Sequence, residues 1–120
     1  MERKREHRRE RLGEALREEI AAIVEGELAD PRIGLVGVAE VQVSPDGKAA
    51  RVFINVAGND AEAESSLEGL SAARAFIRHQ VAERLQLRYA PELFFQLDIS
   101  EHRGSRIGEL LGRINKRKKK

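Results

Sequence analysis

The sequence predicts an α+β domain in which helices cover one face of a three-stranded sheet. First, apolar residues recur every three or four positions in two long stretches, which is typical of amphipathic helices. Second, the turn-forming residues Ser-Pro-Asp-Gly at 44–47 separate two Val-rich stretches, which indicates an antiparallel hairpin. Third, two predicted strands have one apolar and one mostly polar face. The predicted order is α-β-β-α-break-α-β, followed by a short C-terminal helix and a basic tail.

The first part of the chain predicts one helix and the hairpin. The helix is expected to stop at Asp30-Pro31, because the residue before a proline is pushed out of helical geometry. Its apolar face consists of Leu12, Leu16, Ile20, Ile23 and Val24. The two strands are expected at 35–43 and about 49–57. In the first strand, the later valines are out of phase with the earlier ones, which indicates a bulge or partial burial of both faces.

The stretch after the hairpin predicts a loop and then a long helix. Residues 58–64 are polar and are expected to form the loop. Ser65 and Glu68 match a capping box, in which each side chain satisfies a free amide at the start of a helix. The helical pattern then continues to about Leu87.

Arg74 interrupts the apolar seam of this long helix. Either its side chain reaches along the core to solvent, or the helix breaks near 71–75, where small residues favour a break. A third strand is expected at 93–99, and a short amphipathic helix at 107–114 leads into the basic tail.

Composition limits the function classes that the chain can serve. A length of 120 residues fits one domain, and the absence of Cys excludes disulfides and thiolate chemistry. Aromatic residues are scarce, with four Phe, one Tyr and no Trp, which argues against a base-stacking platform, because such a platform needs exposed rings at regular spacing. There is no apolar run long enough to span a membrane and no secretory signal pattern, so we expect a cytoplasmic protein without a membrane partner.

Charge is segregated along the chain. Residues 1–11 carry six Lys or Arg and three Glu, and residues 113–120 carry six Lys or Arg and no acid, which leaves −7 for the remainder of a chain of net charge +2. Each basic end alone could be a solvated tail, but two on one small domain favour a polyanionic partner. We divide the chain into a basic segment at 1–11 that begins the first helix, a binding domain at 12–100, and a helix with basic tail at 101–120.

Arginine pairs four residues apart mark a second candidate contact surface for phosphate groups. Arg74 and Arg78 form one pair, and Arg84 and Arg88 form another; salt bridging to acidic neighbours is the alternative, particularly for the second pair. The candidate RNA-binding residues are Arg3, Lys4, Arg5, Arg8, Arg9, Arg74, Arg78, Arg88, Lys116, Arg117, Lys118, Lys119 and Lys120.

No catalytic constellation is recognisable. His7, His79 and His102 lie in unrelated contexts, zinc-ligand spacings are missing, and neither phosphate-cradling glycine motif is present. We therefore expect no enzyme, no metal, no cofactor and no small-molecule substrate. A small hydrolase acting through His79 or Asp98 is the weakest alternative.

A broken helix beside a three-stranded sheet resembles a type II KH domain. Such domains clamp RNA with a GxxG loop between the two helices, and this sequence has no GxxG at that place. The chain resembles the bacterial ribosome-binding factor A family from about Arg9 to Ile114. The matching segments are DPRIG at 30–34, VQVSPD at 41–46, ARVFI at 50–54, FIR at 76–78, LRYAPELFFQLD at 87–98, and Ile107, Leu110 and Leu111.

The resemblance implies a KH type II-like fold in which an Ala-x-Gly kink replaces the GxxG loop. Ala73, Arg74 and Ala75 occupy the kink here, and Ala75 departs from the family's glycine. It also implies a monomeric factor that binds the small ribosomal subunit and its RNA in late maturation, with roles in 5′-end processing of that RNA and in growth at low temperature. The alternative is a protein-interaction module whose basic ends contact an acidic partner, with the 107–114 helix as docking surface.

Overall fold

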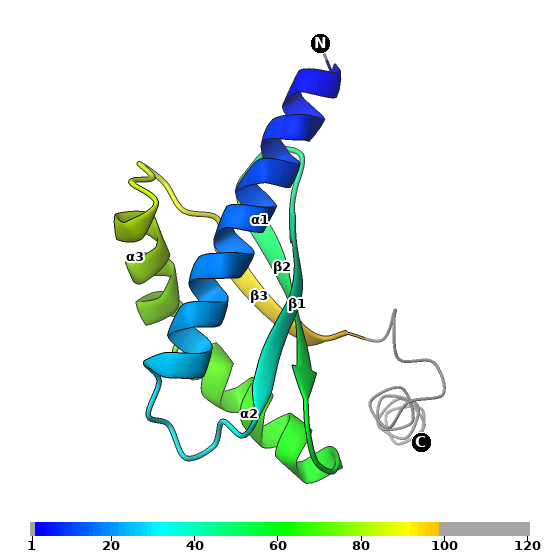
Figure 1. Cartoon of the computed structure of the whole chain (residues 1–120), viewed down its shortest axis with the longest axis vertical. Coiled ribbons are helices and arrows are strands. Elements are labelled where there is room, and N and C mark those ends of the chain that lie inside the picture. The colour runs from blue at the N-terminus through cyan, green and yellow to red at the C-terminus, as the bar shows by residue number, and fades with distance from the viewer. Residues whose placement is uncertain (1, 99–120) are drawn as a thin grey trace.

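The computed structural model describes residues 2–98 of the chain (Figure 1). The predicted helix at 107–114 and the basic tail lie outside these residues. The elements are α1 (Glu2–Gly26), β1 (Val36–Val43), β2 (Ala49–Val56), α2 (Asp60–Ala72), α3 (Arg74–Arg84) and β3 (Glu92–Leu97). This order, with two consecutive helices before the last strand, confirms the predicted fold class.

The three strands form one mixed sheet in the order β1-β2-β3. β1 and β2 pair antiparallel across a turn in which Gly47 has φ 74°, a left-handed conformation that suits glycine. β2 and β3 pair parallel, because α2 and α3 carry the chain back to the start of the sheet. The register of β1 and β2 shifts between Val38 and Glu40, which confirms the bulge and brings both Val38 and Val41 to the buried face.

All three helices lie against one face of the sheet (Figure 1). The core between the layers is apolar, and Leu16, Ile20 and Ile23 of α1 have no exposed surface. From the sheet, Ala50, Val52, Ile54 and Val56 alternate into this core, as the sequence predicts for the second strand. Ile77 and Val81 close it from α3.

The predicted loop at 58–64 is wrong, and so is the capping box at Ser65 and Glu68. α2 begins at Asp60, and Asn59 is its N-cap: the Asn59 side chain accepts from the Glu62 amide at 2.9 Å, and Glu62 accepts in return from the Asn59 amide. The spacing Asn-x-x-Glu fits a capping box as well as Ser-x-x-Glu does, so local pattern alone cannot choose between them.

Ser65 and Ser66 bond to a loop and do not cap a helix. Ser65 donates its hydroxyl to the carbonyl of Arg32 at 2.9 Å, and the hydroxyl of Ser66, which is fully buried, accepts from the Gly34 amide at 3.0 Å. These bonds hold the segment between α1 and β1 against the middle of α2.

Candidate nucleic-acid interface

The break between α2 and α3 lies at Ala73. This residue has φ −87° and ψ 1°, so the chain turns there without a left-handed conformation. Its amide still donates to Gly69 at 3.0 Å, and its carbonyl accepts from Ile77 at 2.9 Å, so hydrogen bonding continues through the break. Ala75 lies inside α3 and has no positive φ. The break therefore forms without the glycine that the resemblance leads one to expect at this position.

Arg74 opens α3 directly after the break. Its side chain is half-buried, and its guanidinium carbon stands 5.7 Å from the ring centre of Phe94 on β3, which is within the range of a cation–π interaction. The contact ties the start of α3 to the edge strand of the sheet. Phe94 is 46% exposed, so its ring and the Arg74 guanidinium are side by side where a ligand can contact both.

Arg78 lies one helical turn further along the same face of α3. Its Nε and Nη2 atoms donate to the carbonyl of Ala90 at 3.1 and 2.8 Å, which fixes the segment before β3. The residue is exposed, so its remaining N–H groups can reach another acceptor. Arg78 thus combines a structural contact with an available charge.

The second arginine pair does not share a helix face, because α3 ends at Arg84 and Gln86 has φ 53°. Arg84 forms ion pairs at the C-terminal end of α1. Its Nη2 atom donates to Glu27, the residue after α1, at 2.5 Å, and its Nη1 atom lies 3.7 Å from Glu19 of α1. The bond to Glu27 raises the pKa of Arg84. For Arg84 the salt-bridge alternative is therefore confirmed, whereas Arg88 is exposed in the loop before β3.

The cations of the N-terminal segment divide between two faces of α1. Lys4, His7, Arg8 and Arg11 line one shallow depression, as their spacing of three and four residues along a helix requires. We call these four residues the α1 stripe. Arg8 is exposed, as are Lys4 and Arg11. The stripe presents three permanent positive charges within about two helical turns, an arrangement suited to consecutive phosphates.

The other predicted N-terminal contacts lie outside the stripe. Arg9 is half-buried in a depression that it shares with Glu6, Glu10 and Glu40, where carboxylates offset its charge. Arg5 is exposed on α1, and Arg3 lies in its first turn. The five predicted contacts at 116–120 fall outside the described residues.

Sequence reasoning missed Arg11 and Arg51. Arg11 could have been found from its spacing to Lys4 and Arg8, once the helix was known to begin at Glu2. Arg51 is exposed on the face of β2 that turns away from the helices, and its neighbours there depend on the pairing of β2 with β3.

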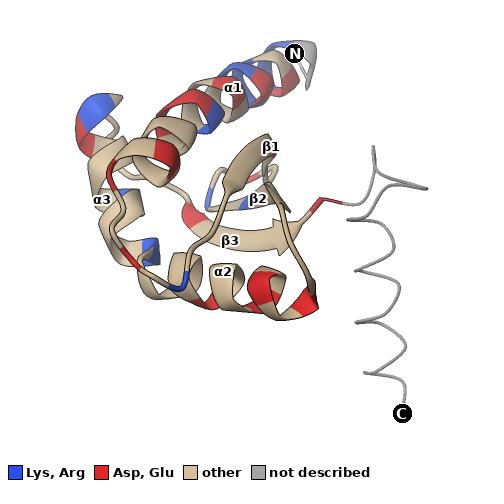
Figure 2. Ribbon diagram, turned by 60° about the horizontal axis from the view of Figure 1, so that its bottom comes forward, with Lys and Arg blue, Asp and Glu red and all other residues tan. Residues whose placement is uncertain are grey.

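Acidic residues occupy a different part of the surface. α2 contains the exposed Glu62, Glu64 and Glu68, the buried Asp60 and no Lys or Arg. Figure 2 shows only red charged segments on this helix, whereas α1 carries both red and blue. An anionic ligand is therefore repelled from α2. Within residues 2–98, the α1 stripe and the α3 side of the break are therefore candidate contacts for a polyanion.

Within residues 2–98, the structure shows no metal site and no paired carboxylates at β3. Within this range no cluster of three or more His, Asp or Glu side chains could hold a metal ion. His79 is exposed and lies 3.1 Å from Glu83, one turn along α3. Glu92 and Asp98 stand at opposite ends of β3, about 20 Å apart, so they cannot act as a carboxylate pair. In the part of the chain that the structure covers, no helix is long and apolar enough to cross a membrane.

Comparison with known proteins identifies the family. The family model described as ribosome-binding factor A matches residues 8–111. Among curated proteins, ribosome-binding factor A of Koribacter versatilis is 63% identical over 113 residues, which cover 94% of this chain and 92% of that protein. That of Desulforamulus reducens is 40% identical over 114 residues, covering 95% of both chains.

Solved structures show the same fold. The crystal structure of ribosome-binding factor A from Thermus thermophilus matches with a TM-score of 0.66 and 28% identity, over 74% of this chain and 94% of that one. A homology model of the Thermus thermophilus factor, fitted into a cryo-EM map of a 30S–RbfA complex, matches with a TM-score of 0.63 and 28% identity, over 73% and 92% of the two chains. On its sequence and its fold, this chain belongs to the ribosome-binding factor A family.

Proposed function

We propose that this protein is a non-enzymatic assembly factor that binds the small ribosomal subunit and its RNA during late maturation. The observation that carries the proposal is the match to a Thermus thermophilus factor that has been placed in a complex with the 30S particle. The cations of the α1 stripe and of the α2–α3 break support it, because a surface of this kind attracts RNA backbone.

The break supplies contacts of a different kind from the stripe. A GxxG loop at the break would offer backbone amides to RNA, and the sequence has none between α2 and α3. Arg74 and Arg78 stand on one face of α3 in its place, and arginine can grip a phosphate through two parallel N–H groups. The acidic surface of α2 then keeps the RNA on the other side of the break.

The family resemblance supports the finer parts of the proposal. In this view the protein acts as a monomer in the cytoplasm, without a small-molecule substrate. It contributes to 5′-end processing of the small-subunit RNA, and cells need it most when they grow at low temperature. The cations at 116–120 add attraction that does not depend on RNA sequence.

Sedimentation from growing cells tests the proposal. A tagged full-length protein should travel with free or immature small subunits in a sucrose gradient at low salt and be absent from translating ribosomes. Equal amounts in both fractions, or in neither, would contradict it. Treatment with nuclease should release the protein from its particle, whereas a complex that survives nuclease would favour an acidic protein partner.

A further inference from the structure

The face of the sheet that turns away from the helices carries a compact polar and aromatic group. The strand register places Gln42, Arg51 and Phe94 in one row across β1, β2 and β3. Phe53 and Gln96 pair in the next row. Among residues 2–98, no helix covers this face (Figure 1).

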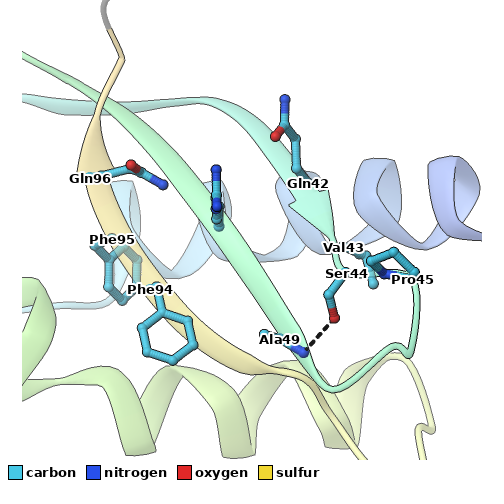
Figure 3. Close-up of a pocket in the computed structure, with 9 residues that line it drawn as sticks. Gln42, Val43, Ser44, Pro45, Ala49, Phe94, Phe95 and Gln96 are labelled. Atoms are coloured by element: carbon cyan, nitrogen blue, oxygen red, sulfur yellow. Dashed lines mark hydrogen bonds between the residues drawn. The ribbon is translucent and has the colours of Figure 1, made fainter.

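These side chains border a pocket of about 570 Å³ at the hairpin end of the face. Gln42, Ser44 and Pro45 form one wall, and Phe94 and Gln96 of β3 form the other (Figure 3). The hydroxyl of Ser44 accepts from the Ala49 amide at 3.0 Å, which closes the hairpin end. The volume lies within the range of pockets that hold small organic groups.

Each group around the pocket can recognise part of a nucleotide. Phe94 offers a half-exposed ring on which a base can stack. Gln42 and Gln96 each carry an amide that both donates and accepts. Within residues 2–98, Gln42 uses one N–H group, which donates to Glu40 at 3.4 Å. Arg51 is exposed and has no ion-pair partner within the described residues, so its guanidinium is available for a phosphate or a base carbonyl.

The charge of the pocket favours a single nucleotide over a stretch of backbone. Glu40 and Glu92 are exposed at the margins of the same face and offset the positive charges of Arg51 and Arg74. Because these charges nearly cancel, they add little to the affinity for a run of phosphates. One unstacked base gains from the ring and the amides, which do not depend on net charge.

Arg74 connects the pocket to the proposed RNA contacts. Its guanidinium lies over the Phe94 ring at 5.7 Å, and the residue itself opens α3 at the break. The break and the pocket are therefore adjacent, so one RNA can contact both. We propose that the open face of the sheet binds one unstacked ribonucleotide, with its base against Phe94 and its polar edge or phosphate at Arg51 and the two glutamines. This inference rests on the proposed RNA-binding function.

A tryptophan reporter tests the stacking directly, since the chain contains no Trp. Phe94→Trp places the fluorophore in the pocket, and Phe76→Trp on α3 is a matched control, because the two rings are 46% and 47% exposed and Phe76 does not line the pocket. The probes are four RNA hairpins, each with a different single bulged base, and the same hairpin fully paired. At least one bulged hairpin should quench the fluorescence of the Phe94→Trp protein more than the paired hairpin does, while the Phe76→Trp protein responds equally to both.

A second pair of variants measures affinity without altering the ring. The wild-type chain should bind the preferred bulged hairpin about tenfold more tightly than the paired one, as expected for one stacked base. Arg51→Gln should reduce this ratio toward 1. Lys48→Gln, which removes the same charge from the neighbouring exposed turn, should leave the ratio unchanged.

The results distinguish a failure of the proposed nucleotide site from a failure of the proposed RNA-binding function. If the wild-type chain bound bulged and paired hairpins equally, the proposed nucleotide site would be wrong, while RNA binding itself would stand. The same holds if Lys48→Gln reduced the ratio of the two affinities as much as Arg51→Gln did. Failure to bind any hairpin, together with failure to sediment with small subunits, would overturn both.

Discussion

Gly13 lets α1 lie directly against the backbone of β1. A Cβ atom at this position would stand 2.6 Å from the carbonyl oxygen of Val41, too close for any real contact. Gly13→Ala should therefore lower the free energy of unfolding by about 1–3 kcal/mol, even though alanine is the better helix former by roughly 1 kcal/mol. Urea denaturation followed by circular dichroism measures the change. Gly26→Ala, at the open end of the same helix, is the control and should not destabilise; equal losses at both sites would contradict the packing.

Asp30 makes a small part of the free energy of unfolding depend on pH. Its carboxylate accepts from the Arg32 guanidinium at 2.6 Å and from the Arg32 amide at 2.9 Å, and these bonds lower the pKa of Asp30 to about 2. Because the folded value is depressed, the contribution is present above about pH 4 and is lost as the pH falls toward 2. When the pH is lowered from about 4.5 to about 2, the midpoint of urea denaturation should thus fall less for Asp30→Asn than for the wild type. Parallel curves would show that the bonds carry no stability.

At the scale of elements, the start of α2 shows how tertiary contacts choose between two equally good local patterns. Asn59 and Ser65 both begin a capping box, but Ser65 is already bonded to the loop at Arg32. Asn59→Ala should lower stability by about 1 kcal/mol through loss of the cap. Glu68→Ala, in the box that does not form, should change it by less than about 0.5 kcal/mol. Thermal unfolding of the two variants gives the comparison, and a larger loss at Glu68 would mean that the helix starts where the sequence suggested.

The elements that follow local periodicity could be predicted from the sequence, and those fixed by distant contacts could not. The bulge in β1, the buried face of β2 and the break beside Arg74 all follow from which residues repeat every two or every three to four positions. The end of α3 depends on a left-handed Gln86, which no local rule requires. The pairing of Arg84 with Glu27 joins residues 57 positions apart. The pocket on the open face arises only once β3 is placed parallel to β2.

At the scale of the whole molecule, charge separates the surface into regions that attract and repel RNA. The α1 stripe and the break are positive, α2 is negative, and residues 113–120 add six further cations. Deletion of 113–120 should make the dependence of log affinity on log salt shallower, by up to about 5 if every cation meets a phosphate. Binding to small-subunit RNA at several salt concentrations measures this slope. An unchanged slope would mean that the tail makes no phosphate contact.

The proposed function depends on one claim, that the positive surface of α1 binds the small subunit. The direct measurement is the affinity of the full-length protein for purified small subunits, compared between Arg8→Gln/Arg11→Gln and the control Arg17→Gln/Lys48→Gln. Both variants lose two charges, but Arg17 is paired with Glu14, and Lys48 of the hairpin turn does not line the depression that the stripe borders. The stripe variant should bind about tenfold more weakly at low salt, with a salt slope reduced by about 2, while the control stays near the wild type. Equal weakening of the two variants would contradict the claim, and so would unchanged binding of the stripe variant.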